Sequence, residues 1–301
     1  MTFGLVLGAG GQAGEAFHRG VVRAMTDLGF DARQAEVIVG TSAGSMVAAS
    51  LRRHLTRRDV EDADGSTPTG VPVAEPGAPS GARRLLPHRT TALHLWRRPR
   101  QALNAVLIAP EFTAGRTSIE FLRDGLPARH QSWPEALLYI VAVRRNDGRR
   151  VVFGQRGEPR PDVGAAVAAS CAIPGYFTPI EVDGVAYVDG GLHSPTNADV
   201  LANAGLDLVV VSSPMSVQLR SVRGRLDLPL RLLFHGYLRE EVWTLQRHGT
   251  RVVTIEPDAA VLAVTGLNLM DGRQIHDIEE RAYELGRQRL RGLPLSLAKR
   301  T

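Results

Sequence analysis

Short apolar runs alternate with longer amphipathic stretches along most of the chain, a pattern typical of strands that alternate with helices. Apolar runs closed by glycine or other turn residues predict strands at 3–7, 36–39, 136–143, 150–153, 185–188, 206–212 and 252–255. Apolar positions at helical spacing predict helices at 15–28, 45–55, 163–170, 228–246 and 275–290. This order of elements predicts a layered α/β fold with a mainly parallel sheet.

The alternation breaks down after residue 58. The segment 62–81 contains four prolines and several glycines but few side chains that could pack in a core. We therefore expect one domain over residues 1–301 that carries a flexible insertion at about 60–110. The basic stretch 83–100 is expected to be a solvated surface segment, with a lid as the alternative.

Composition excludes some classes of protein and leaves others open. The chain has 301 residues, is 44% hydrophobic and carries a net charge of +5, and nearly all of its positive charge comes from arginine. This excess reflects either coding bias or a basic surface for anionic lipid headgroups. The basic residues are not interleaved with aromatic residues, so we expect no nucleic-acid partner. No stretch approaches the roughly 20 apolar residues of a membrane span.

Cysteine usage and the N-terminus bear on the compartment. The single cysteine, Cys171, allows no disulfide within the chain and no thiolate metal cluster. In its Ala-rich surroundings, Cys171 is expected to be a small core residue. The N-terminal apolar run lacks a basic leader and is too short for a signal peptide. We expect a cytoplasmic protein without metal or cofactor. Peripheral contact with a membrane and the oligomeric state stay open.

The strongest chemical signal is the G-x-S-x-G pentapeptide Gly40–Gly44, which lies between a predicted strand and a predicted helix. A sharp strand-to-helix turn exposes a serine hydroxyl above the sheet, and the flanking glycines avoid Cβ clashes in that turn. The helix N-terminus behind Ser42 favours negative charge nearby. Ser42 is therefore the candidate nucleophile. The alternative is that Ser42 only caps the helix.

The glycine loop Gly8–Gly14 allows two interpretations. Its backbone amides could stabilise the oxyanion of a tetrahedral intermediate. The loop also fits the G-x-G-x-x-A pattern of a Rossmann-type dinucleotide-binding protein. That second function needs an acidic residue at the end of the next strand, and Glu36 stands at the wrong end of it. The sequence favours the oxyanion hole.

A third signal is Asp189, which follows a predicted strand and precedes two glycines. Such an aspartate could reach a serine on a neighbouring strand, although Asp-Gly is also an ordinary turn pair. His193 lies four residues further on and suggests a Ser-His-Asp triad as a rival arrangement. We expect His193 to be a surface or structural residue.

Taken together and in order, these blocks resemble the patatin-like phospholipase family. The segment Ala169–Phe177 also resembles the family's Ser-x-Ala-x-Pro-x-x-Phe motif. The resemblance implies a three-layer α/β/α fold with a Ser–Asp dyad that acts on lipid or acyl esters. By this resemblance, Ser42 attacks the ester carbonyl, Asp189 takes its proton, and the amides of Gly10 and Gly11 hold the oxyanion.

One departure from the family pattern lies in the glycine loop. Many members carry Arg or Lys there, where this chain has Gln12 and Ala13. If the cation orients the loop in other members, another group must do so here. The backbone donors survive the change. The departure leaves a catalytically lapsed lipid-binding module as a further alternative.

Overall fold

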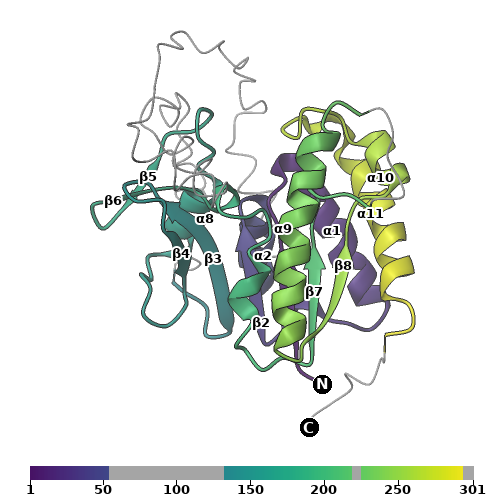
Figure 1. The fold of residues 1–301 in the computed structure, drawn as a ribbon, viewed down its shortest axis with the longest axis horizontal. Coiled ribbons are helices and arrows are strands. Elements are labelled where there is room, and N and C mark those ends of the chain that lie inside the picture. Colours follow the sequence, from purple (N-terminus) through teal and green to yellow (C-terminus); the bar gives the residue numbers. More distant parts are fainter. Residues whose placement is uncertain (54–131, 219–224, 294–301) are drawn as a thin grey trace, which may run out of the picture.

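The computed structural model describes residues 1–53, 132–218 and 225–293 (Figure 1). The insertion predicted at about 60–110, with the basic stretch 83–100 inside it, falls within 54–131, outside the described residues. The described part is built around one mixed sheet with helices on both faces (Figure 1).

Among the described residues, eight strands form the sheet, in the order β5-β6-β3-β2-β1-β7-β8, with β4 paired to β3. Five strands run parallel to one another: β1 (Phe3–Leu7), β2 (Val37–Thr41), β3 (Leu137–Arg144), β7 (Leu208–Ser212) and β8 (Arg251–Ile255). Three are antiparallel to their neighbours: β4 (Arg150–Phe153), β5 (Ile180–Val182) and β6 (Val185–Asp189). The mainly parallel sheet predicted from the sequence is confirmed.

The helices cover the two faces of the sheet unequally. One face carries α1 (Gly11–Asp27), α2 (Ala43–Arg52), α8 (Val163–Cys171), α10 (Ala259–Val264) and α11 (Ile275–Leu290). The other carries α9 (Leu228–Arg247) and the 3₁₀ turn η4 (Ala198–Leu201). Further 3₁₀ turns are η1 (Ala32–Gln34), η3 (Gly190–Leu192) and η5 (Gly272–Gln274).

Each strand contributes alternate side chains to the two cores. On β1, Leu5 and Leu7 pack under α1, whereas Val6 faces α9. Both faces are thus buried, which explains why β1 and β7 appear in the sequence as continuous apolar runs. The three-layer α/β/α architecture is confirmed.

The main corrections to the predicted elements lie at the candidate site. Helix α1 begins at Gly11, four residues before the predicted start, so the free loop is shorter than expected. Strand β2 extends to Thr41 and α2 begins at Ala43, which reduces the predicted five-residue turn to Ser42 alone. Tertiary packing of these first turns against the sheet overrides the low helix propensity of glycine. The sequence did not predict the short elements β5 and α10.

The most consequential feature of the sheet is a junction on β3. Strand β2 pairs with β3 up to Thr41 opposite Val141, and β6 pairs with the next stretch, with Asp189 opposite Ala142. Strand β4 overlaps both stretches and must occupy the other edge of β3. Therefore β2 and β6 share one edge of β3, and their carboxyl ends meet head-on. The register itself places residue 42 beside residue 189.

Candidate active site

Ser42 forms the whole turn between β2 and α2 and adopts a strained backbone conformation. Its φ and ψ angles are 52° and −124°, a combination that costs roughly 1–3 kcal/mol for a residue with a Cβ. Its backbone N–H donates to Ser170 Oγ at 2.9 Å, and its carbonyl accepts from the Ser45 amide at 2.7 Å. Although Ser42 stands at the N-cap position, its side chain makes no capping hydrogen bond. The simple helix-cap interpretation is therefore wrong.

The Asp189 carboxyl group lies beside this turn and is buried. Its Oδ1 accepts a hydrogen bond from the Gly191 amide at 2.6 Å. Burial raises the pKa of Asp189 to about 6, and hydrogen bonding to the Ser42 side chain and to the Gly191 amide opposes the rise because it favours the charged form. At neutral pH the group is ionised and more basic than an ordinary aspartate. The structure thus brings together the two side chains singled out in the sequence.

The glycine loop packs against both halves of this pair. The Gly44 amide donates to the Gly8 carbonyl at 3.1 Å, and the Ala9 amide donates to the Pro195 carbonyl, beyond Asp189, at 2.7 Å. A Cβ built on Gly191 would lie 3.3 Å from the Ala9 Cβ. The loop therefore lies next to the nucleophile turn and next to the turn that carries the aspartate.

The amides of Gly10 and Gly11 stand where α1 begins. Neither donates a hydrogen bond to any residue in the described part of the chain. The first amides of a helix have no partner within it and carry the positive end of the helix dipole. The Ala13 amide is instead satisfied by the Leu269 carbonyl at 3.0 Å. This contact from the C-terminal part of the chain holds the first turn of α1, which contains Gln12 and Ala13.

The buried side chain of His18 holds the start of the glycine loop against β7 through two hydrogen bonds. His18 Nε2 lies 2.7 Å from the Gly8 carbonyl and Nδ1 lies 2.8 Å from Ser212 Oγ. Because a carbonyl only accepts, Nε2 carries the proton and the neutral Nδ1 accepts from the Ser212 hydroxyl. Burial lowers the pKa of His18 to about 4, and the hydrogen bond to Gly8 only partly offsets that effect. His18 is a structural histidine that must stay neutral.

This histidine makes stability pH-dependent. Between pH 6.5, its ordinary pKa, and about 4, the unfolded chain binds more protons at His18 than the folded chain does. Wild type should therefore lose stability relative to a His18→Gln variant as pH falls through this window, by up to about 3 kcal/mol. Urea unfolding of both proteins at several pH values measures the difference. A difference that stays constant across the window would contradict the assignment.

Ser170 and Cys171, from the segment Ala169–Phe177, lie next to the turn formed by Ser42. Ser170 Oγ accepts from the Ser42 amide and donates to the Val141 carbonyl at 2.6 Å. It thereby links the Ser42 turn to β3 at the point where β2 and β6 meet. Cys171 is buried beside Ser42 and Ser45, and burial raises the pKa of its thiol. A protonated, buried thiol fits the expected core role. The sequence had marked this segment only through its resemblance, without a role for Ser170.

The rival Ser-His-Asp triad finds little support. Burial opposes the shift, but the hydrogen bonds and charge of Arg150, followed by the charge of nearby His193, lower the pKa of Asp199, so His193 lies on the Asp199 side of this loop. The Asp189 carboxylate accepts from the Gly191 amide at 2.6 Å, and the Ser42 side chain lowers its pKa. The geometry favours a direct contact between Ser42 and Asp189.

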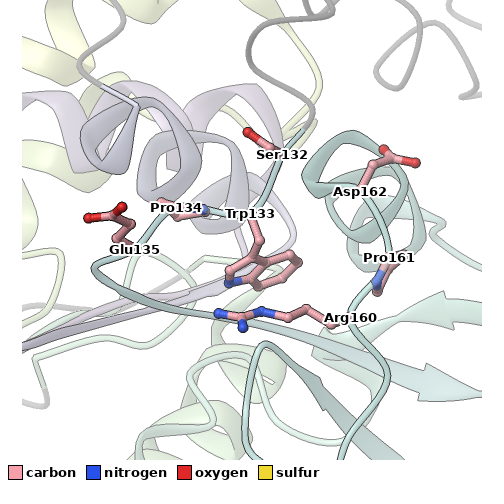
Figure 2. A pocket seen from close by; sticks show the side chains of 7 residues that line it. All are labelled: Ser132, Trp133, Pro134, Glu135, Arg160, Pro161 and Asp162. Carbon is pink, nitrogen blue, oxygen red and sulfur yellow. The ribbon is translucent and has the colours of Figure 1, made fainter.

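A large open cavity lies away from this site. Its volume is about 750 Å³, and Figure 2 shows the side chains that line it, including Trp133 and Arg160. The lining residues precede β3 and α8, whereas Ser42 follows the carboxyl end of β2 and contacts the last turn of α8. The cavity and the candidate site therefore lie at opposite ends of α8 and of the parallel strands. The cavity provides no part of the chemistry.

Comparison with known proteins decides the family. The family model described as patatin-like phospholipase matches residues 5–202. The chain belongs to the patatin-like phospholipase family. The matched range contains the glycine loop, Ser42 and Asp189, so all three blocks that carried the resemblance lie inside it. Membership of this family confirms the resemblance seen in the sequence.

Relatives of the chain are longer than the chain itself. Uncharacterised NTE-family proteins from Mycobacterium bovis and from two strains of Mycobacterium tuberculosis are each 31% identical to it over 209 residues. The alignment covers 69% of this chain and 48% of each relative. The chain thus spans about half the length of these curated relatives.

Two solved structures align with this chain over most of its length. VipD from Legionella pneumophila aligns over 96% of this chain and 66% of its own, with a TM-score of 0.48 and 15% identity. The type III effector protein ExoU aligns over 96% of this chain and 53% of its own, with a TM-score of 0.41 and 18% identity.

Across the described ranges of the present chain, no helix has the length and apolar character needed to cross a bilayer.

Proposed function

We propose that the chain is a serine acyl hydrolase of the phospholipase A or lipid esterase type. Ser42 is the nucleophile, Asp189 is the general base, and the amides of Gly10 and Gly11 hold the oxyanion. The observation that carries the proposal is the placement of Ser42, at a strained strand-to-helix turn, beside the buried Asp189 carboxyl group, whose pKa the Ser42 side chain lowers. A weak nucleophile needs such an adjacent base.

In the acylation step, Ser42 Oγ attacks the carbonyl carbon of the ester and its proton moves to Asp189. The negative charge develops on the former carbonyl oxygen, where the free amides at the start of α1 can donate to it. Collapse of the intermediate breaks the bond to the alcohol oxygen. Asp189 returns its proton to that oxygen, and the acyl group remains on Ser42.

In the deacylation step, Asp189 takes a proton from water as the water oxygen attacks the acyl carbonyl. The second tetrahedral intermediate collapses with release of Ser42 Oγ, which recovers the proton from Asp189. The products are a carboxylic acid and the regenerated hydroxyl. Because the pKa of Asp189 is about 6, the same group can accept and return the proton near neutral pH.

The proposed substrate class rests on family membership. The patatin-like phospholipase family points to an acyl ester of a lipid, and contact with a lipid surface is part of the proposal. A Rossmann-type dinucleotide site is the weaker alternative, because β2 ends in Thr41 where that site needs a carboxylate.

Active-site labelling tests the proposal most directly. A fluorophosphonate probe should modify wild type at Ser42, as mapped by mass spectrometry, and should leave a Ser42→Ala variant unlabelled. Ser50→Ala serves as the matched control, because Ser50 lies on the same helix and its hydroxyl bonds the Met46 carbonyl of that helix at 2.9 Å. The control should label and hydrolyse a chromogenic ester like wild type. Labelling that persists in Ser42→Ala would refute the assignment.

A catalytically lapsed lipid-binding module is the second candidate. It is favoured by Gln12 and Ala13 at the positions where family members carry a cation. This function predicts binding to lipid vesicles without labelling of Ser42. The hydrogen bond from Ala13 to Leu269 supports an ordered loop and therefore favours the active enzyme.

A further inference from the structure

The head-on junction between β2 and β6 poses a mechanical problem. The two strands share an edge of β3 but do not pair with each other, so β3 and the residues packed along its edge hold Ser42 beside Asp189. The backbone approach is close there, since a Cβ on Gly190 would lie 2.2 Å from the Val141 carbonyl oxygen. Ser170 ties the Ser42 side of the junction to β3, and a group that bonds both Thr41 and Gly190 would tie the two sides to each other directly.

Asn197 supplies hydrogen bonds to both sides of the junction. Its Nδ2 atom lies 3.2 Å from Thr41 Oγ1, 3.3 Å from the Gly190 carbonyl and 2.5 Å from the Ser194 carbonyl. Thr41 immediately precedes Ser42, and Gly190 immediately follows Asp189. An amide nitrogen has two hydrogens, so one serves Ser194 and the other is shared between Thr41 and Gly190.

The backbone at this position also suits asparagine. Asn197 has φ 53° and ψ 32°, the left-handed region that asparagine tolerates better than most residues with a Cβ. Its side chain is fully buried, and Oδ1 accepts from Arg150 at 3.3 Å. Asparagine therefore suits this position both by its backbone conformation and by the hydrogen bonds of its side chain.

The loop that carries Asn197 is anchored from two elements. Glu241 on α9 accepts from the Thr196 hydroxyl at 2.5 Å and from the Ala198 amide at 2.9 Å, and it is buried. Arg150 on β4 makes two hydrogen bonds to the Asp199 carboxylate, at 2.7 and 2.8 Å. These contacts fix the residues on either side of Asn197, so its amide is presented to the junction in one orientation.

We propose that Asn197 is a positioning residue that sets the separation between the Ser42 hydroxyl and the Asp189 carboxylate. The inference rests on the proposed function, because it assigns a role in the same reaction. Asn197 acts through Thr41 and Gly190 and needs no contact with substrate. Displacements of the order of 1 Å between reacting groups can cost about 100-fold in rate.

The test compares two substitutions that keep the backbone conformation accessible. Asn197→Gly tolerates the left-handed region and removes the amide, whereas Asn197→Asp keeps the size but loses both Nδ2 hydrogens. With a chromogenic acyl ester, each should lower kcat by about 10- to 100-fold while KM stays within about twofold, because positioning and not substrate binding is lost. The rate of fluorophosphonate labelling should fall in parallel.

Asp207→Ala is the control for a merely structural role. Asp207 accepts from the Thr2 amide at 2.6 Å at the amino ends of β1 and β7, the end of the sheet opposite Ser42 and Asp189, so its loss should lower the melting temperature without lowering kcat. Thr41→Val removes one acceptor of Nδ2 with little change in shape and should also lower kcat, which keeps the test available if the Asn197 variants do not fold. Unchanged kcat in the folded variants, or an equal loss of kcat in Asp207→Ala, would overturn the inference. Wild type that neither labels nor hydrolyses would instead defeat the proposed function itself.

Discussion

Replacement of Asp189 by asparagine is expected to lower kcat by about 1,000-fold while leaving the protein more stable at neutral pH. Asparagine has nearly the same shape and keeps an oxygen that can accept from Ser42 and Gly191, but it cannot take up a proton. A chromogenic ester assay measures the first effect and urea unfolding measures the second. Hydrolysis at the wild-type rate would eliminate Asp189 as the base.

The gain in stability follows from the pKa of the aspartate. Its pKa is about 6 in the folded chain against an ordinary value of 3.8, so between these values the folded chain binds more protons than the unfolded chain. Wild type should therefore lose stability relative to the asparagine variant as pH rises from about 4 to 6, by up to about 3 kcal/mol. The asparagine variant lacks this penalty, although its buried NH₂ group offsets part of the gain. The stability difference should thus grow across this window and level off above it.

The same ionisation should appear in the kinetics. Only the charged carboxylate accepts the Ser42 proton, so kcat/KM of wild type should rise through pH about 6 and then reach a plateau. Agreement between this kinetic midpoint and the pH window of the stability difference would connect both to one group. A kinetic midpoint near 4 would show that the carboxylate is solvated during catalysis.

The sequence was sufficient for the elements that bury a continuous or periodic apolar surface. Strand β1 and helix α11 have the bounds that the pattern predicts, because a run of apolar residues and a helical repeat are both local signals. The start of α1 could not be predicted, because it depends on contacts such as that between Ala13 and Leu269. Short elements such as β5 carry too few residues for a period.

The pairing within the candidate site depends on register, which is not local. Ser42 and Asp189 each had a motif, but their proximity results from two strands that end on one edge of β3. No spacing in the sequence encodes that junction. Asn197 had no signal beyond being a polar residue in a loop, and Ser170 had only its place in a family-like segment.

The glycine after the nucleophile turn should be almost impossible to replace. Helix α2 crosses the end of β1 so closely that a Cβ on Gly44 would lie 2.0 Å from the Leu7 carbonyl oxygen. Both contacting groups are backbone, and β1 is hydrogen-bonded on both edges, so neither can move aside. Gly44→Ala should therefore destabilise the fold by at least about 3 kcal/mol and displace Ser42 with the helix.

Gly236→Ala provides the matched control for this substitution. Gly236 also lies within a helix, α9, but it is exposed and no atom lies near the position of its Cβ. Replacing it should stabilise the protein by about 0.5–1 kcal/mol, because alanine loses less backbone entropy in a helix. Urea unfolding of both variants should therefore give changes of opposite sign. If Gly44→Ala proved as stable as wild type, the close approach of α2 to β1 would be excluded, and with it the geometry that exposes the Ser42 hydroxyl to Asp189.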